Sequence, residues 1–318
     1  MSPAIEVEDV TRVFDSGGKP ALALDHVSFA VGDGEIVGLL GSNGAGKTTL
    51  TKILSTLLLP TSGTARVLGV DVVRDPRRVR GSQSVVLGGD RGLYGQLSAR
   101  ENLRFFGMMA GLPHRSLRSR VGAALQEVGL DEAADRRVSA FSRGMRQRLH
   151  IAIGMISEPR ILLLDEPTVG LDPAEAGRLR EAIAALRERG VSVLLTSHYL
   201  VDVEQLADRV IMLDRGRVTH EMTVGQFTAS AGYAAVVVIR GTGPRPDTAR
   251  LGDAADLSTG PEAAGDHWTV SVRLRSWSAA TFSELSVILA DSRVDDVEVR
   301  PVRLDDAFLR LQAAGASR

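Results

Sequence analysis

The eight residues at 41–48, Gly-Ser-Asn-Gly-Ala-Gly-Lys-Thr, constrain the fold of this chain more than any other part of its sequence. They follow a run at 35–40 that is typical of a buried strand, and they precede a segment at 48–58 whose apolar residues recur at helical spacing. A strand, a glycine-rich loop and a helix in this order gather backbone N–H groups at a helix N-terminus, where they favour phosphate. We therefore expect an α/β fold in which this loop binds phosphate groups.

Each residue type in the loop has a physical reason to be there. The glycines let backbone N–H groups surround the phosphates, Lys47 is expected to reach the β- and γ-phosphates, and the Thr48 hydroxyl is expected to ligate Mg²⁺. A chance glycine-rich turn is the alternative, which the flanking strand and helix disfavour. The other contacts expected from this loop come from Gly41, Ser42, Asn43, Gly44, Ala45, Gly46 and Thr49.

A second candidate site follows the apolar run Ile161 to Leu164. Asp165 and Glu166 come directly after this run, so they are expected at the C-terminal tip of a buried strand beside the phosphate loop. Asp165 is then placed to hold Mg²⁺ directly or through water, and Glu166 is placed to act as a general base. The alternative is that both are solvated acids at the end of a strand.

Four further residues carry weaker signals by themselves. His198 follows an expected strand at 191–196, and a single histidine at a strand end is more often structural than catalytic. Ser142 is expected to cap a helix whose N-terminus favours an anion, and Gly144 allows close backbone approach to that anion. Taken alone, Ser142 is only an N-cap and Phe14 is an ordinary core aromatic.

The pattern along the chain predicts two domains with a boundary near residue 225. Residues 1–225 show the strand and helix alternation of a parallel sheet, preceded by a β-rich start and interrupted at about 95–158 by a mostly helical insertion. Helix signals lie at 101–110, at 117–128 and after Asp172. In the last of these helices Asp172 is the expected N-cap, Glu175 is the capping-box residue and Gly190 ends the helix. Strand signals return at 161–164, 191–196 and 210–213.

Residues 226–318 are expected to form a small α+β domain. The stretch 241–266 is rich in Gly, Pro, Ala and Asp and is expected to be a long loop. The alternation at 269–275 and at Val297 and Val299 predicts strands, while Phe282, Leu285 and Leu289 share one helical face.

Composition excludes several classes of protein. No apolar stretch approaches the ~18 to 20 residues that cross a bilayer, and residues 1–9 lack the pattern of a secretory signal. The chain has no cysteine, which excludes disulfides and suits a cytoplasmic location. A net charge of −1 gives no reason to expect nucleic-acid binding. Arginine is nevertheless frequent from 95 to 148, which fits either a solvated face or a surface facing a membrane or a partner.

Taken in order, these motifs over residues 5 to 222 resemble those of ATP-binding cassette (ABC) ATPases. Phe141-Ser142-Arg143-Gly144-Met145 is similar to the family's signature motif, usually Leu-Ser-Gly-Gly-Gln, and the Asp-Glu pair at 165–166 follows it closely. The resemblance implies an ATP site with Mg²⁺, in which Phe14 stacks on adenine and His198 contacts the γ-phosphate. It also implies that Ser142, Arg143, Gly144 and Met145 meet the ATP of a second cassette, and that Gly170, Leu171 and Asp172 form the D-loop between the two sites.

One position departs from the family pattern. ABC ATPases normally have a glutamine at the end of the strand before the helical insertion, and this chain has Gly89 there. Gln83 and Gln96 are too distant to replace it without a shift in register. This departure leaves two outcomes open. Hydrolysis is slow, or Asp90 or a water molecule takes the place of the missing glutamine.

The resemblance implies an ATPase subunit of a transporter that exports drugs, antibiotics or other hydrophobic compounds. Its expected partners are a second copy or a paralogous cassette and a separate membrane permease, with the chain held at the cytoplasmic side of the membrane. The signature variant and the tail at 304–311 are similar to those of resistance exporters. A cassette without a membrane partner, or a regulatory module with weak hydrolysis, is the alternative.

Overall fold

The computed structural model describes residues 3–16, 19–87, 92–244, 246, 255–259, 267–274 and 279–308. The chain divides into two compact units, residues 1–223 and 224–318, and each is described by itself. Among the described residues, no helix has the length and apolar character needed to span a membrane.

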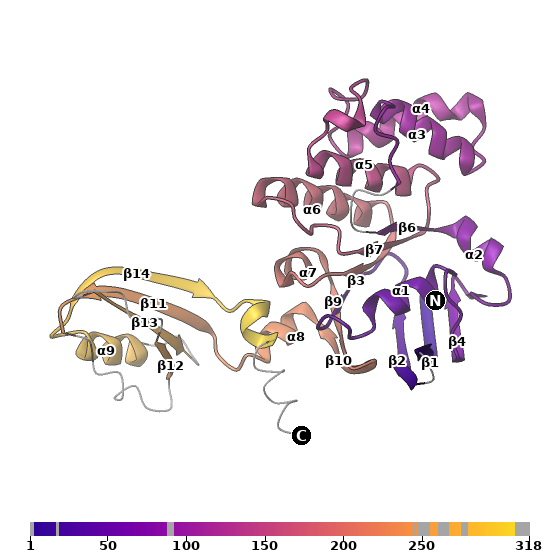
Figure 1. Cartoon of the computed structure of the whole chain (residues 1–318). Helices are drawn as coiled ribbons and strands as arrows, with labels where there is room; N and C mark the ends of the chain where they lie inside the picture. The colour runs from indigo at the N-terminus through magenta and orange to yellow at the C-terminus, as the bar shows by residue number, and fades with distance from the viewer. Residues whose placement is uncertain are drawn as a thin grey trace. The chain divides into compact units, whose positions relative to one another are not determined.

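The first unit is organised around a six-stranded sheet with the order β10-β9-β3-β8-β7-β6 (Figure 1). All neighbours are parallel except β10 with β9. The central strands are apolar runs because both faces of the sheet are covered, and every residue of β3 and β8 is buried. The strands are β3 (Ile36–Leu40), β6 (Gln83–Leu87), β7 (Ile161–Asp165), β8 (Ser192–Thr196), β9 (Arg209–Asp214) and β10 (Arg217–Thr223).

A second, antiparallel sheet carries the order β2-β1-β4-β5. Its inner face shares one apolar core with α1 and one side of the parallel sheet, and Leu24, Leu50 and Leu163 lie in that core. The elements are β1 (Ile5–Ser16), β2 (Lys19–Val31), α1 (Lys47–Leu54), β4 (Ser62–Val67), β5 (Val70–Asp71) and α2 (Pro76–Ser82).

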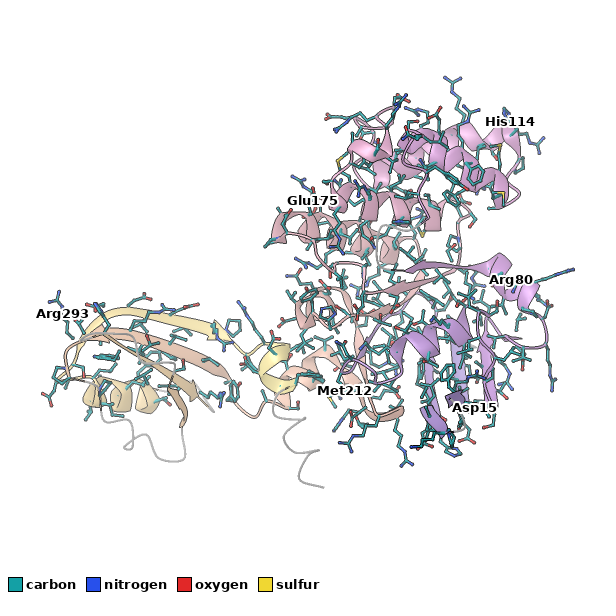
Figure 2. The ribbon with its side chains drawn as sticks, in the orientation of Figure 1. Asp15, Arg80, His114, Glu175, Met212 and Arg293 are labelled. Atoms are coloured by element: carbon teal, nitrogen blue, oxygen red, sulfur yellow. The ribbon has the colours of Figure 1, made fainter. Side chains whose placement is uncertain are left out.

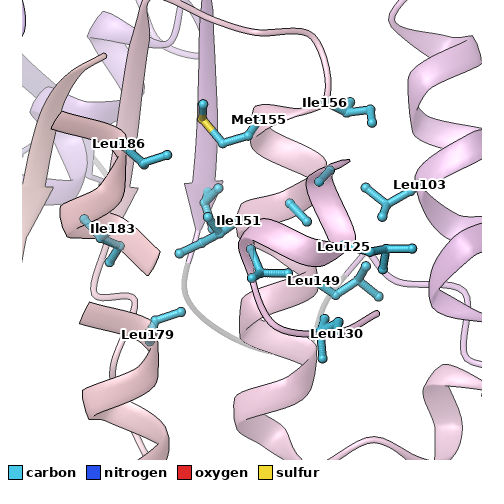
Figure 3. Packing of buried hydrophobic residues seen from close by; sticks show 14 of the residues in the cluster. Leu103, Leu125, Leu130, Leu149, Ile151, Met155, Ile156, Leu179, Ile183 and Leu186 are labelled. Carbon is cyan, nitrogen blue, oxygen red and sulfur yellow. The ribbon is translucent and has the colours of Figure 1, made fainter. Parts of the chain in front are cut away.

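The helical part packs on the opposite side of the parallel sheet. Figure 3 shows α5 residues Leu149, Ile151 and Met155 between the α6 leucines and residues from α3 and α4. This packing makes the start of α5 part of a continuous core. The elements are α3 (Ala99–Met109), α4 (His114–Glu127), the short 3-10 helix η1 (Val138–Ala140), α5 (Arg143–Met155), α6 (Pro173–Glu188) and α7 (Leu200–Leu206).

The second unit is a four-stranded antiparallel sheet with the order β12-β13-β11-β14. Leu285 of α9 packs against Val237, Trp268 and Val272, so α9 covers one face of the sheet. The elements are α8 (Val224–Ala229), β11 (Ala235–Thr242), β12 (Ala255–Thr259), β13 (His267–Leu274), α9 (Ala279–Ile288) and β14 (Arg293–Pro301).

The predicted fold class is confirmed, whereas two local expectations are wrong. Strand β12 lies inside residues 241–266, which were expected to form a long loop. Residues 255–259 form a strand because they pair with β13 in the sheet. The helix expected around Phe282 and Leu285 is present as α9, with Leu285 buried and Phe282 57% exposed. Asp172 caps α6 as expected, but the Glu175 carboxylate lies beside Arg148, at 3.5 Å, so the capping box is only half formed.

Candidate active site

The phosphate loop follows β3 and ends at the first turn of α1, as its sequence predicts. Gly44 and Gly46 adopt φ values of 83° and 111°, in the left-handed region that glycine tolerates. A Cβ on Gly46 would also come within 2.6 Å of the Ala23 carbonyl oxygen. The loop therefore needs glycine at this position both for its backbone conformation and for the close approach of β2.

Lys47 is the first residue of α1 and its side chain turns back over the loop. The Nζ group donates hydrogen bonds to the carbonyl oxygens of Gly41 at 2.8 Å and Ser42 at 3.1 Å. Burial lowers the pKa of Lys47, although the nearby carboxylates of Glu166 and Asp165 oppose this effect. A buried ammonium held by carbonyl groups is poised to exchange these partners for phosphate oxygens.

Asp165 lies at the end of β7 and faces the phosphate loop. Its Oδ2 atom is 3.4 Å from the Thr48 hydroxyl, and its Oδ1 atom accepts a hydrogen bond from the Thr196 hydroxyl at 2.5 Å. A threonine hydroxyl beside a carboxylate offers the hard oxygen ligands that Mg²⁺ takes, so the donor set fits this ion. Thr196 was not expected in the site, and its only sequence signal was its place as the last residue of a buried strand.

Glu166 has an unusual backbone that the surrounding structure holds in place. Its φ is 50°, in the left-handed region, which costs a non-glycine residue about 1 kcal/mol or more. The Glu166 N–H donates to the carbonyl and hydroxyl oxygens of Thr196, at 3.0 Å and 3.2 Å. Its Oε2 atom lies 3.3 Å from Nδ1 of His198. The two expected catalytic side chains are therefore neighbours, and the strain is concentrated where the chemistry is expected.

A buried carboxylate ties together the two loops that carry Glu166 and His198. Asp202 on α7 is 1% exposed and accepts hydrogen bonds from Thr168, from Ser197 at 3.0 Å and from Arg180 at 2.9 Å. Thr168 is two residues after Glu166, and Ser197 precedes His198. Asp202 thus positions both loops, and sequence inspection missed it because nothing in its pattern distinguishes it from a surface acid.

The signature motif forms the start of α5. The Ser142 hydroxyl accepts a hydrogen bond from the Met145 N–H at 3.1 Å, which makes it the expected N-cap. Gly144 is buried, and a Cβ there would collide with the Glu175 carboxylate of α6. The Arg143 guanidinium lies against Gly170, whose φ is 70°. Close packing therefore joins the signature motif to the D-loop residues of the same chain.

Phe14 lies on β1 and is partly exposed. The Arg12 guanidinium covers one face of its ring, with its central carbon 4.5 Å from the ring centroid. A flat aromatic group stacked on Phe14 would therefore use the ring's other face or displace Arg12.

Gly89 and Asp90, where the family has its glutamine, lie outside the described residues. Gln83 pairs with Ile161 at the start of β6, whereas Leu87 pairs with Asp165 at its other end. The Gln83 amide donates to the Leu54 carbonyl oxygen at 2.7 Å. Four residues of strand, about 13 Å, therefore separate Gln83 from Asp165.

Comparisons with known proteins agree with this geometry. Residues 24–169 match the family model described as ABC transporter. The chain is 35% identical over 322 residues to the doxorubicin resistance ATP-binding protein DrrA of Mycobacterium tuberculosis, which covers 97% of this chain and 93% of that protein. It is 40% identical over 303 residues to the daunorubicin resistance ATP-binding protein DrrA2 of Streptomyces coeruleorubidus, with 91% and 90% covered.

The fold agrees as well. The solved structure of cbiO1 from Clostridium perfringens, part of the ABC transporter complex cbiONQ, superposes with a TM-score of 0.64 at 25% identity, over 70% of this chain and 89% of that one. The chain therefore belongs to the family of ABC transporter ATP-binding subunits, which are ATPases.

Proposed function

We propose that this chain binds ATP with Mg²⁺ and hydrolyses it to drive the export of drugs, antibiotics or related hydrophobic compounds. The observation that carries the proposal is the convergence of Thr48, Asp165, Glu166 and His198 at the carboxyl edge of β3, β7 and β8, beside Lys47. Ligands bind at this edge in open α/β sheets.

Each residue has one role in the proposed reaction. Lys47 binds the β- and γ-phosphates, and Thr48 and Asp165 would hold Mg²⁺, which supplies charge stabilisation for the phosphate oxygens when bound. Glu166 accepts the proton of the attacking water, and His198 contacts the γ-phosphate and orients that water through its neighbour Glu166. Phe14 stacks on the adenine ring.

We propose that two chains form the complete sites. Helix α5, which begins with the signature motif, packs on α3, α4, α6 and β6, whereas α1 behind the phosphate loop packs on β2, β4 and β7. Ser142 and Gly144 thus belong to a different layer of the fold from Lys47. A second copy or a paralogous cassette brings its own Ser142, Arg143, Gly144 and Met145 to the ATP held here, and Gly170, Leu171 and Asp172 link the two sites.

A hollow of about 450 Å³ supports docking of a membrane permease on the helical side of the parallel sheet. It lies between β6 and α5, and its lining includes Val85, Phe106 and Ile153. Tyr94, close to it in sequence, is 49% exposed and stacks edge-on against Phe105. A hollow lined by both apolar and polar residues, among them Arg80 and His150, fits an amphipathic helix of a partner protein. This would hold the chain at the cytoplasmic side of the membrane.

The names of the relatives, which are resistance ATP-binding proteins, support drugs and antibiotics as the class of substrate. Residues 226–318 are proposed to form an accessory domain of the same subunit.

The test is ATP hydrolysis by the purified chain, alone and with the membrane protein encoded beside it. We expect turnover that rises when the membrane partner is present in a bilayer and rises again with an anthracycline. Turnover that does not respond to the partner would contradict the transport role.

A further inference from the structure

A basic pocket lies between α3 and α4, away from the residues of the ATP site. Its volume is about 470 Å³, within the range of pockets that hold small ligands. The two helices contribute basic side chains around an apolar floor, and Figure 2 shows His114 at the outer end of this helical hairpin. The lining residues are Arg100, Arg104, His114, Leu117, Arg118 and Val121.

The positive charge of this pocket is only partly compensated within the chain. Arg100 pairs with Asp135 at 2.7 Å, but the Asp135 side chain is 79% exposed. The Glu101 carboxylate accepts hydrogen bonds from the backbone N–H and the hydroxyl of Ser98, where it completes a capping box. Within the part of the chain that the structure describes, the side chains of Arg104, His114 and Arg118 make no hydrogen bond or ion pair, although the charge of Arg104 attracts the Glu101 carboxylate.

The spacing of these residues brings the charges together. Arg100 and Arg104 are four residues apart on α3, and His114 and Arg118 are four residues apart on α4, so each pair shares one helical face. Helix α4 has no acidic residue in its first turn and no side chain that caps its N-terminus. The free N–H groups of that turn add to the positive potential at the same end of the pocket. Phosphate oxygens are the acceptors that suit converging guanidinium groups.

The surface beside the pocket indicates which molecule carries the phosphate. Met108 lies four residues after Arg104 and continues the same stripe of α3. Met108 and Met109 are 53% and 73% exposed at the end of α3, directly before the turn that leads to His114. Arginines beside exposed, flexible apolar side chains match a bilayer surface, where phosphate groups lie next to acyl chains. A soluble phosphate would make no use of the methionines.

We propose that this pocket binds the phosphate headgroup of an anionic phospholipid while Met108 and Met109 enter the edge of the acyl region. The inference rests on the proposed function in one respect, namely that a membrane lies beside the chain. It adds a direct contact between the ATPase subunit and lipid, independent of the permease.

The test is co-sedimentation of the purified chain with vesicles. We expect binding to vesicles of phosphatidylglycerol and phosphatidylcholine in equal parts, and little binding to phosphatidylcholine alone. A basic residue near an anionic surface contributes roughly fivefold to partitioning, so R104Q/R118Q should bind roughly twenty-five-fold more weakly. M108Q/M109Q should weaken binding to the same vesicles at constant net charge.

The matched control is R77Q/R78Q, which removes two exposed arginines of α2 and the same net charge. It should bind as the unaltered chain does, and an equal loss would overturn the pocket assignment. Displacement from vesicles by inorganic phosphate at the ionic strength of a matched chloride control, together with unchanged vesicle binding by M108Q/M109Q, would assign the pocket to soluble phosphate and overturn the lipid proposal. ATP hydrolysis without vesicles, measured on the same samples, tests the proposed function separately, because none of these residues belongs to the ATP site.

Discussion

The guanidinium of Arg143 occupies the space that a side chain on Gly170 would need. Arg143 is the first residue of α5, within the signature motif, and Gly170 belongs to the D-loop between β7 and α6. The family usually has glycine where this chain has Arg143. In this chain an arginine therefore fills the gap between two segments that the proposed dimer needs to move together.

Substitution of Gly170 by alanine tests this relationship. The new Cβ would displace Arg143, and the φ of 70° would add about 1 kcal/mol of backbone strain. We expect G170A to slow steady-state ATP turnover several-fold while the affinity of the isolated chain for ATP stays within about twofold, as measured by nucleotide titration.

The control for this prediction is G177A. Gly177 lies within α6, and a Cβ there would meet no atom within 4 Å. Alanine should stabilise the helix by about 1 kcal/mol and leave turnover unchanged. If G177A slowed turnover as much as G170A, the contact between Arg143 and Gly170 would have no special role.

Substitution of Glu166 by glutamine separates binding from chemistry. Glutamine keeps the shape of the side chain but cannot accept the proton of water, so turnover should fall by about 10²- to 10⁴-fold. ATP binding should be retained, because Lys47 and the loop N–H groups are untouched. Glu181 on α6 is exposed, and E181Q is the matched control, expected to retain full turnover. Turnover of E166Q close to that of the unaltered chain would rule out Glu166 as the base.

Sequence patterns predicted the elements of the site better than the contacts that hold them. The phosphate loop, the strand before Asp165 and the cap at Ser142 depend on neighbours in sequence, so local pattern was sufficient. Thr196 and Asp202 act through partners about thirty residues away, which no local pattern encodes. The same reason explains the error at Glu175, where a tertiary contact with Arg148 replaced the local capping box.

The second unit contained the least predictable part of the fold. Strand β12 has a composition that favours loops, and it exists because β13 offers an unpaired edge. The basic stretch from 95 to 148 was equally ambiguous in the sequence, since only the packing of α3 on α4 gathers Arg104 and Arg118 into one pocket.

The pair Arg300 and Asp306 predicts an acid-sensitive second unit. Burial raises the pKa of Asp306, but hydrogen bonds from Arg300 and the Arg303 N–H outweigh it, and the pKa lies below its ordinary value. A carboxyl group whose pKa is lowered on folding contributes its full stabilisation when the pH is above its pKa in the unfolded chain, about 3.9. This stabilisation is lost as the pH falls through the pKa of the group in the folded chain. We expect the urea midpoint of this unit to fall steeply below about pH 4.

Intrinsic fluorescence measures this transition selectively. Both tryptophans of the chain, Trp268 and Trp277, belong to the unit at 224–318. D306N should lower the midpoint at neutral pH and flatten its dependence on acid. D295N is the control, because Asp295 is exposed and lies 3.6 Å from Arg293. An unchanged acid dependence in D306N would contradict the assignment.

The central claim is that each ATP is hydrolysed between the phosphate loop of one chain and the signature motif of another. Two variants, K47A and S142E, should each be inactive alone, because each destroys both sites of a homodimer. Mixed in equal amounts, they should recover about a quarter of the unaltered turnover, since half of randomly assembled dimers are mixed and each carries one intact site of two. An inactive mixture that still forms mixed dimers, or full turnover by S142E alone, would contradict the account.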